Sequence, residues 1–251
     1  MGKKLPFLAG RKALITGAAD RLGRATALAL AAAGADIVIH YHRSRRKAEA
    51  TAAEISRLGR KAWTVKADLA DDAQARNLVA HAVKLARGPL DILVNSASIF
   101  PICRLADMTS EDLALNMQVN ALSPLALARD FAAQDKPGDI INFLDCRIGD
   151  YDPAHVAYLL SKQALAGLTR MMALEFAPRI RVNAVAPGLI LPPPGQSQEY
   201  LERLVSTNPL KRHGNPADIT EAVLFLLRSP FVTGQVIYID GGRHLRGPTV
   251  P

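Results

Sequence analysis

Short apolar runs with strand character alternate with long helical stretches along almost all of this chain of 251 residues. Seven strands are predicted, at residues 13–16, 37–40, 62–65, 90–94, 139–144, 180–185 and 236–239. Helices are predicted between them, at residues 22–33, 45–58, 71–85, 110–131, 156–176 and 217–227. Because strand–helix–strand repeats build parallel sheets with helices on both faces, the alternation predicts an α/β fold with a doubly wound, seven-stranded sheet.

Composition agrees with such a fold. Hydrophobic residues make up 49% of the chain and aromatic residues only 5%, so small aliphatic side chains must fill the core. No repeat or linker interrupts the pattern, and we expect residues 1–251 to form a single domain. The two cysteines, Cys103 and Cys146, match neither a disulfide framework nor a metal-binding motif, which favours a cytoplasmic protein without metal. No apolar run suits a membrane span, and the first ten residues lack the apolar stretch of a signal peptide.

One irregular stretch, residues 187–198, lies between a predicted strand and the next helix and contains Pro192, Pro193 and Pro194. In a doubly wound sheet the ligand lies beyond the carboxyl ends of the strands, which is the side that this stretch occupies. We therefore interpret residues 187–205, approximately, as a loop that covers the substrate. An ordinary surface connection is the alternative.

A glycine-containing turn, residues 16–23, connects the first strand with the first helix. Gly17 can supply an unusual backbone conformation, and Gly23 lets the helix approach the sheet closely. The free N–H groups at the start of the helix, around Leu22, suit a pyrophosphate. Such a strand–turn–helix near the N-terminus is typical of a Rossmann-type dinucleotide-binding unit.

The net charge of +8 favours an anionic ligand, and the position of the basic residues narrows the choice. After the second strand the chain reads Tyr41-His42-Arg43-Ser44, followed by three more basic residues and no acid. NAD-binding units usually have an acid here for the ribose 2′-hydroxyl, whereas Arg43 and Ser44 suit a 2′-phosphate, so the predicted cofactor is NADPH. The alternatives are a nucleic-acid patch, which lacks stacking aromatics beyond Tyr41, and a solvated helix start.

Tyr158 and Lys162 are four residues apart in a predicted helix and therefore lie on one helix face. A nearby ammonium stabilises phenolate, so we expect Lys162 to lower the pKa of Tyr158 and to let the phenol exchange protons near neutral pH. An ordinary Tyr and Lys on a helix is the alternative, which the pair alone does not exclude.

The glycine turn and the Tyr-x-x-x-Lys pair resemble the short-chain dehydrogenase/reductase family, whose turn usually reads TGxxxGxG. Further segments in the same order along nearly the whole chain are similar to that family's cofactor contacts: Asp68-Leu69 to an adenine-contacting pair, Asn95-Ser96-Ala97-Ser98 to its NNAG segment, and Pro187-Gly188, followed by Leu189, to the PG beside the nicotinamide. The resemblance implies an NADPH-dependent oxidoreductase. It also implies that Lys162 holds the nicotinamide ribose and that Asn120 anchors a water that relays protons to Lys162.

Two positions depart from the family pattern in an informative way. Arg21 stands where the middle glycine of the turn is expected, and we interpret its guanidinium as a contact to the cofactor phosphates and the substrate mouth. A tolerated substitution on an exposed turn is the alternative. Asp145 stands thirteen residues before Tyr158, where the family usually has a serine.

The change from serine to aspartate alters which substrate is expected. Serine donates a hydrogen bond to a substrate carbonyl, whereas an ionised aspartate only accepts and would repel a carbonyl oxygen. A substrate with N–H groups, or one protonated at nitrogen, therefore fits Asp145 better than a simple ketone. The alternative is a shifted alignment, in which Ser161 or another hydroxyl takes the serine's role.

These departures resemble the pteridine reductase branch of the family, and residues 240–246 are similar to the C-terminus of bacterial dihydromonapterin reductases, which also reduce dihydrofolate. The resemblance implies hydride transfer from NADPH to a pterin of the dihydromonapterin, dihydrobiopterin or dihydrofolate type. The proton would arrive through Asp145, Tyr158 and Lys162. The residues that it implies for the substrate are Arg21, Ser98, Phe100, Asp145 and Tyr158.

Phe100 would stack on the flat pterin, with plain core packing as the alternative. The resemblance also implies a homotetramer in which Arg246 could reach a neighbouring subunit's site. Two other functions remain open. One is an NADPH-dependent carbonyl reductase for a ketoacyl or sugar ketone, which would be expected to have Ser at position 145. The other is a non-enzymatic NADPH-binding regulator, which would be expected to lack the intact Tyr158 and Lys162.

Overall fold

A computed structural model describes residues 6–193 and 195–246, so Pro194 and the extreme termini lie outside the described residues. The seven predicted strands are confirmed, with ends that differ from the prediction by at most two residues. They are β1 (Lys12–Ile15), β2 (Asp36–Tyr41), β3 (Ala62–Lys66), β4 (Ile92–Asn95), β5 (Gly138–Phe143), β6 (Ile180–Pro187) and β7 (Val236–Ile239). All neighbouring pairs are parallel, in the order β3-β2-β1-β4-β5-β6-β7. This is the predicted doubly wound sheet.

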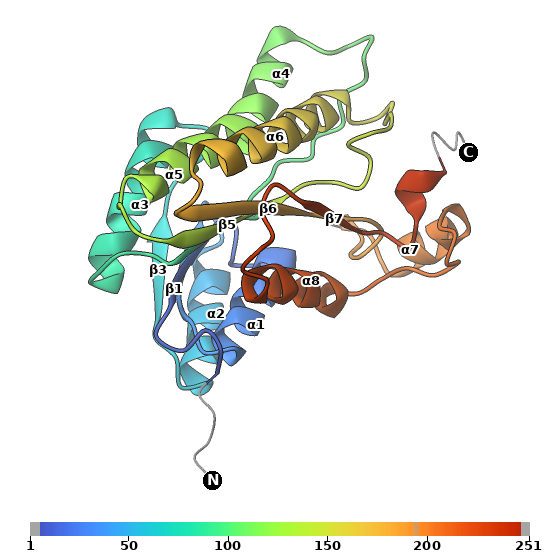
Figure 1. Ribbon diagram of the computed structural model, residues 1–251. Helices are drawn as coiled ribbons and strands as arrows, with labels where there is room; N and C mark the ends of the chain where they lie inside the picture. The colour runs from blue at the N-terminus through green and yellow to red at the C-terminus, as the bar shows by residue number, and fades with distance from the viewer. Residues whose placement is uncertain (1–5, 194, 247–251) are drawn as a thin grey trace.

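Helices cover both faces of the sheet, as Figure 1 shows. One layer consists of α1 (Arg21–Ala32), α2 (Arg45–Arg57) and α8 (Pro216–Arg228). The other consists of α3 (Asp72–Ala86), α4 (Ser110–Met117), α5 (Ser123–Ala132) and α6 (Val156–Glu175). Two hydrophobic clusters match these layers, because one joins the sheet to α1, α2 and α8 and the other joins it to α3, α5 and α6.

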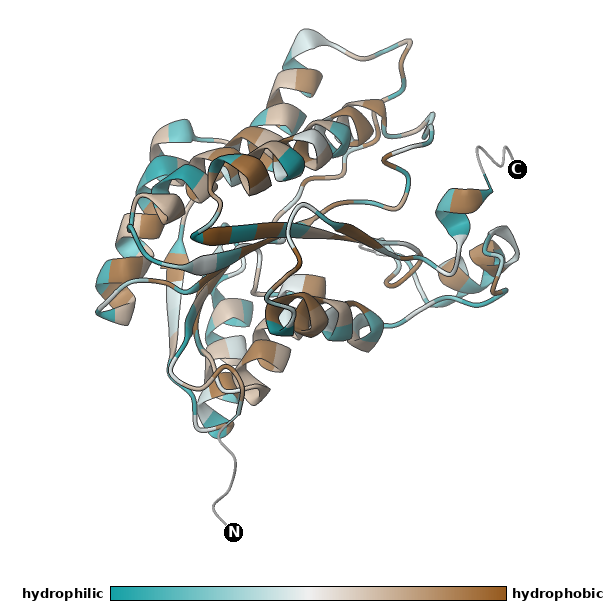
Figure 2. Ribbon diagram, viewed as in Figure 1, coloured by the Kyte–Doolittle hydropathy of each residue, from teal (hydrophilic) through white to brown (hydrophobic). Residues whose placement is uncertain are grey.

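The sheet is apolar on both faces, and Figure 2 shows brown segments along the strands that Figure 1 labels β6 and β7. β4 and β5 are buried along their whole length, since helices pack on them from both sides. The helices present Ala, Leu and Ile to the sheet, as the low aromatic content requires. No helix among the described residues is long and apolar enough to cross a membrane.

Two predicted segments differ from the structure. The predicted helix at 110–131 is not one regular α-helix, because a π-helical turn at Gln118–Leu122 separates α4 from α5. Such turns widen a helix by one residue and often occur at functional sites, and this one contains Asn120. The predicted loop at 187–205 is also partly helical, because α7 (Glu199–Leu204) begins inside it. Alternation along the sequence could not detect α7, which is short and has a single buried residue, Leu201.

The carboxyl ends of the strands define one edge of the molecule. In Figure 1, β6 and β7 point towards the side on which α7 and the C-terminal segment lie. The turn after β1, the segment after β4, the connection from β5 to α6 and the segment after β6 all leave the sheet at this edge. The predicted site residues lie in or next to these connections and those after β2 and β3, or in the first turns of α1 and α6, whereas Asn120 lies in the π-helical turn.

Candidate active site

The glycine turn after β1 is closely packed against the segment after β4. Gly17 has a φ of 65°, and a Cβ on it would lie 2.9 Å from the Cα of Ala97. A Cβ on Gly23 would collide with the carbonyl oxygen of Gly17. Thr16 Oγ1 accepts hydrogen bonds from the backbone N–H groups of Ser96 and Ala97, both at 3.0 Å. Only glycine fits at these two positions, which leaves an open backbone cradle at the start of α1.

His40, near the end of β2, is hydrogen-bonded to the same turn. The backbone N–H of Gly17 donates to its Nδ1 at 3.1 Å, and its Nε2 lies 3.1 Å from the carbonyl oxygen of Ala67. Burial lowers the pKa of His40 from 6.5 to about 4, so the ring is neutral at neutral pH. One imidazole thus connects the glycine turn to the segment that carries Asp68 and Leu69. No sequence pattern predicted this role for His40.

Arg21 begins α1 with a φ of 54°, which is a rare conformation for a residue with a side chain. Asp20 caps the helix by accepting from the backbone N–H of Arg21 at 2.9 Å, and it also forms an ion pair with Lys47. Hydrogen bonding with Lys47 is the main cause that lowers the pKa of Asp20. The guanidinium of Arg21 donates to the carbonyl oxygen of Pro192 at 2.8 Å. Arg21 therefore links the glycine turn to the 187–205 segment.

A basic hollow of about 460 Å³ lies at the ends of β2 and β3. Its lining residues are Tyr41, His42, Arg43, Arg45 and Lys66. Of the two residues predicted to bind the 2′-phosphate, Arg43 lines the hollow, and Ser44 follows it directly at the start of α2. His42 Nε2 lies 3.4 Å from Asp68 Oδ2, on the predicted adenine-contacting segment.

Lys66 also lines this basic hollow, although no sequence pattern predicted it there. Lys66 is paired with Tyr41 in the parallel register, which brings its cation to the same edge of the sheet. The last residues of adjacent parallel strands lie side by side, so a strand-end lysine next to the basic run could have been recognised once the strand order was known.

The three predicted proton-handling side chains meet at the start of α6. Tyr158 Oη donates to Asp145 Oδ2 at 3.0 Å, and Lys162 Nζ lies 5.7 Å from the centre of the Tyr158 ring. Lys162 Nζ donates to the carbonyl oxygen of Phe143 at 2.7 Å. Ser161, the alternative hydroxyl, is fully buried and donates to the carbonyl oxygen of Tyr158 at 2.6 Å.

The expected lowering of the Tyr158 pKa is wrong for this structure. Burial raises the pKa of Tyr158 well above 10, and the charge of Asp145 and its hydrogen bond add to that rise. Burial also lowers the pKa of Lys162 from 10.5 to about 8. Burial disfavours the charged phenolate, and the Asp145 carboxylate at hydrogen-bond distance disfavours it further. Tyr158 is therefore a firm hydrogen-bond donor here.

Phe100 and Ser98 lie beside this group, on the segment after β4. The Phe100 ring meets the Tyr158 ring edge-on, with centroids 4.6 Å apart, and 40% of Phe100 is exposed, so it is not a core residue. Ser98 Oγ donates to Asn120 Oδ1 at 3.0 Å. Asn120 Nδ2 donates to the carbonyl oxygen of Ile99 at 3.1 Å and to Ser161 Oγ at 3.0 Å. The Asn120 side chain thus fixes the 98–100 segment.

The Pro187–Leu189 segment ends β6 at the same edge. Cys146 N–H donates to the carbonyl oxygen of Pro187 at 3.0 Å, which ties this segment to the residue after Asp145. Gly188 is required by close packing, since a Cβ there would lie 2.6 Å from the Cα of Asp240. Leu189 accepts at its carbonyl oxygen from the N–H of Gly214 at 2.9 Å.

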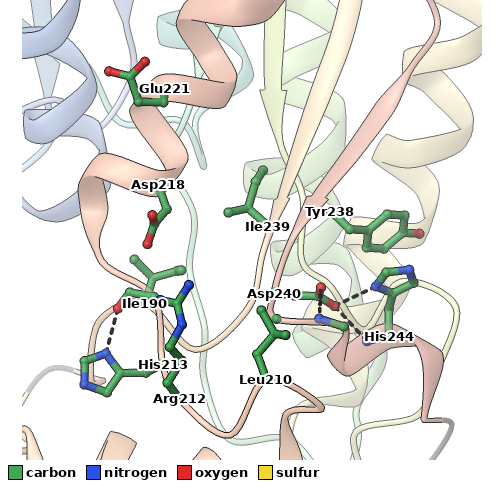
Figure 3. Close-up of a pocket in the computed structure, with 13 residues that line it drawn as sticks. Ile190, Leu210, Arg212, His213, Asp218, Glu221, Tyr238, Ile239, Asp240 and His244 are labelled. Atoms are coloured by element: carbon green, nitrogen blue, oxygen red, sulfur yellow. Dashed lines mark hydrogen bonds and ion pairs between the residues drawn. The ribbon is translucent and has the colours of Figure 1, made fainter.

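A second hollow, of about 520 Å³, lies past this segment, and Figure 3 shows the side chains around it. At its wall Asp240 accepts from the backbone N–H of His244 at 2.7 Å and pairs with the ring Nδ1 at 2.7 Å, while the His244 ring stacks on Tyr238. Its described lining residues do not include the proton-handling group. Arg246, just beyond, donates to the carbonyl oxygen of Ser206 at 3.0 Å, within its own chain.

The fold, the glycine cradle and the Tyr158–Lys162 pair define a class of protein, and comparison with known sequences agrees. The chain belongs to the short-chain dehydrogenase/reductase family of oxidoreductases. Residues 17–244 match the family described as enoyl-(acyl carrier protein) reductase. One relative is the 3-oxoacyl-(acyl-carrier-protein) reductase FabG of Staphylococcus aureus, which is 32% identical over 243 residues that cover 94% of this chain and 98% of that protein.

Two solved structures are similar over almost the whole chain. FolM alternative dihydrofolate reductase 1 from Brucella suis, in complex with NADP, has a TM-score of 0.91 and 37% identity, and covers 97% of this chain and 99% of its own. The corresponding protein from Brucella canis, complexed with NADP, has a TM-score of 0.89 and 36% identity, with 98% of each chain covered. The comparisons thus include both a ketoacyl reductase and dihydrofolate reductases.

Proposed function

We propose that this protein is an NADPH-dependent reductase of a pterin, of the dihydromonapterin, dihydrobiopterin or dihydrofolate type. The observation that carries the proposal is the hydrogen bond of 3.0 Å from Tyr158 Oη to Asp145 Oδ2. A carboxylate beside the tyrosine accepts hydrogen bonds, and a pterin ring offers N–H groups, whereas a ketone offers only an acceptor oxygen. The similarity to the Brucella proteins points in the same direction.

Two features fit NADPH as the cofactor. The cradle at Gly17 and Gly23 lies at the start of α1, where backbone N–H groups and the helix dipole favour the pyrophosphate. The basic hollow at the end of β2 supplies cations for a 2′-phosphate from Arg43 and Lys66. When bound, NADPH supplies the hydride. Lys162 would hold the nicotinamide ribose, and the Pro187–Leu189 segment would border the nicotinamide ring.

The chain's own residues would bind the pterin and supply the proton. Phe100 would stack on the flat ring, with Ser98 and Arg21 as polar contacts. Tyr158 keeps its proton at neutral pH because its pKa is raised, so its hydroxyl has a proton that it would donate to a ring nitrogen. The nearby Lys162 would stabilise the phenol oxygen as its proton leaves, and Asp145 would accept from an N–H group of the substrate.

The balance of the reaction is simple. A C=N bond of the ring is reduced, with the hydride added to its carbon and the proton to its nitrogen, and NADPH is oxidised to NADP. Asn120 would act on this step indirectly, by fixing the segment of Ser98 and Phe100 and, as the family resemblance implies, by anchoring a water next to Lys162.

The substrate can be tested by following NADPH oxidation with dihydrobiopterin, dihydromonapterin and dihydrofolate, beside a panel of ketones and a 3-ketoacyl thioester. We expect turnover of at least one pterin, and Asp145→Ser should lower its kcat/KM by about 10- to 100-fold, which is the usual range for a lost hydrogen bond to a charged group. Turnover of ketones alone by the wild type would overturn the pterin proposal. It would support a carbonyl reductase instead, the function named for the Staphylococcus aureus relative.

The cofactor preference needs a separate measurement. We expect Arg43→Ala to weaken NADPH binding, followed by nicotinamide fluorescence, about tenfold or more while NADH binding changes little, because a guanidinium–phosphate contact is lost. Arg46→Ala is the matched control, since Arg46 belongs to the same basic run but does not line the hollow. Equal losses for the two cofactors in Arg43→Ala would show that Arg43 does not contact the 2′-phosphate.

We further propose a cytoplasmic homotetramer. The two cysteines are unpaired and buried, which suits a reducing compartment. Large apolar side chains on α4 and α6 remain exposed, with Leu115 at 47%, Met171 at 65% and Leu174 at 83%, and such surfaces usually meet another subunit. Light scattering during size-exclusion chromatography would give the mass directly, and a monomeric mass would overturn the assembly.

A further inference from the structure

The connection between β5 and α6 holds a group of polar side chains that the proposed reaction does not use. Arg147, Asp152 and His155 lie in this connection with side-chain exposures of only 25%, 6% and 19%. Burying a guanidinium and a carboxylate costs free energy unless each is paired, so side chains placed here are expected to have a defined set of partners. Their partners include Asp145 and Phe100, two of the side chains proposed to bind the substrate.

Arg147 connects two carboxylates. Its Nη1 lies 2.6 Å from Asp152 Oδ2, and its Nε lies 3.5 Å from Asp145 Oδ1. The backbone N–H of Arg147 also donates to Asp145 Oδ1 at 2.8 Å. One oxygen of Asp145 thus faces Arg147, and the other accepts from Tyr158. Arg147 therefore determines the orientation in which the Asp145 carboxylate meets Tyr158.

Asp152, which pairs with Arg147, also pairs with His155. Its Oδ2 pairs with His155 Nδ1 at 2.9 Å, and its Oδ1 accepts from the N–H of Ala154 at 3.0 Å. Burial alone would raise the pKa of Asp152, but His155 and Arg147 outweigh it and hold the pKa at about 2. Asp152 is therefore ionised at neutral pH and fixes both neighbours.

The His155 ring lies flat against Phe100. Their centroids are 3.8 Å apart and their planes differ by 12°, while Phe100 meets Tyr158 edge-on. The backbone supports this stack, because Cys103 donates to the carbonyl oxygen of Ala154 at 2.8 Å. One face of the Phe100 ring is thus covered by His155, and the segment after β4 is tied to the start of α6.

These contacts close into a ring of six side chains at the start of α6. In order, its members are Asp145, Arg147, Asp152, His155, Phe100 and Tyr158. Three members are proposed to touch the substrate: Asp145 through its carboxylate, Phe100 through its ring and Tyr158 through its hydroxyl. The other three members fix the position of the Asp145 carboxylate relative to the Phe100 ring.

We propose that Arg147, Asp152 and His155 are positioning residues that select a flat, N–H-bearing ring substrate by holding the Asp145 carboxylate and the Phe100 ring in fixed relative position. This inference rests on the proposed function, since it assigns Asp145 and Phe100 to the pterin. Its physical basis is preorganisation, because a stacking surface and a carboxylate that are already placed lose little freedom when the substrate binds.

The first variants test the two arms of the ring separately with the pterin that the wild type reduces. We expect Arg147→Met to lower kcat about tenfold, as misplaced reacting groups do, and Arg147→Lys to restore part of it, since a lysine keeps a cation near one carboxylate. We expect His155→Leu to raise the pterin KM about tenfold, whereas His155→Phe, which retains a stacking ring, should stay near the wild-type KM.

Controls separate positioning from misfolding. NADPH affinity, measured by fluorescence, should stay within about twofold of wild type in every ring variant, because the cofactor cradle is built from other residues. Asp150→Asn removes a carboxylate from the same connection without touching the ring, and its kcat and KM should match the wild type. A variant that loses NADPH affinity is replaced by its conservative partner, Arg147→Lys or His155→Phe.

The double variant Arg147→Met/His155→Leu gives the decisive comparison. If the six contacts act as one ring, either substitution breaks it, and the double variant should lose clearly less kcat/KM than the product of the two single losses. Strictly multiplicative losses, or single variants with wild-type kcat and KM, would overturn the ring while leaving pterin reduction intact. A wild type that reduces no pterin would instead overturn the proposed function and the ring together.

Discussion

His40 offers a quantitative test of how the fold supports the cofactor cradle. The side chain is 2% exposed in β2 and is fixed at both nitrogens. Because Nδ1 accepts from the N–H of Gly17, the single proton of the neutral ring must be on Nε2, where it donates to Ala67. Protonation of Nδ1 would turn that acceptor into a donor facing another donor. Burial accordingly lowers the pKa of His40 from 6.5 to about 4.

The size of the effect follows from that pKa. Between pH 6.5 and pH 4 the unfolded chain binds a proton at His40 and the native protein does not, so stability is lost as the pH falls through this window. One pKa unit is worth about 1.4 kcal/mol, so the whole contribution is about 3 kcal/mol, and most of it is lost by pH 4.5.

Urea unfolding at one fixed protein concentration, at pH 8 and at pH 4.5, measures this directly. In His40→Asn, whose amide retains an acceptor near Gly17, the free energy of unfolding should fall about 2–3 kcal/mol less than in the wild type between the two pH values. His81→Asn is the control, since His81 is an exposed side chain of α3 and should leave the wild-type pH dependence unchanged. Equal falls in the wild type and His40→Asn would refute the buried, neutral ring.

Three further outcomes follow from single contacts. Lys66→Gln should weaken NADPH binding about three- to tenfold and leave NADH binding unchanged in a fluorescence titration, whereas exposed Lys61 at the other end of β3 should tolerate the same change. Gly188→Ala should lower the free energy of unfolding by about 1–3 kcal/mol in urea, because the new Cβ would overlap Asp240. Lys162→Met should abolish turnover yet raise stability at pH 7 by up to about 3 kcal/mol, because the native protein no longer has to hold a buried ammonium whose pKa is lowered to about 8; stability equal to or below wild type would contradict this.

The change of stability with pH tests the lowered pKa of Lys162 independently. Between pH 8 and pH 10.5 the unfolded chain holds a proton on this lysine and the native protein releases it, so wild-type stability should rise with pH in this range. Lys162→Met should lack that rise, and the difference between the two proteins should shrink towards pH 10.

Much of the fold could be predicted from the sequence because local and global signals agree. Strands buried on both faces have continuous apolar sequences, and helices that pack on a sheet have apolar residues at helical spacing. All seven strands could therefore be predicted to within two residues at each end. The π-helical turn at Gln118–Leu122 could not be predicted in this way, because one extra residue in a helical turn leaves the hydrophobic pattern almost unchanged.

The candidate site also has features that the sequence could predict and features that it could not. Motif spacing identified Tyr158, Lys162 and Asp145, because residues four apart on a helix and a residue at a strand end have fixed positions relative to the sheet. The direction of the Tyr158 pKa could not be predicted, because it depends on how deeply the ring is buried and on which charge lies nearest.

The sequence by itself determined the doubly wound sheet, the glycine turn, the basic run after β2 and the residue types around the tyrosine, because each of these is a local pattern. Only the tertiary structure decided which distant residues complete the site. Lys66 joins the basic hollow through strand register, His40 joins two loops through one ring, and Arg147 reaches both Asp145 and Asp152. These contacts depend on strand order and on how the chain turns at the carboxyl edge, which no local pattern encodes.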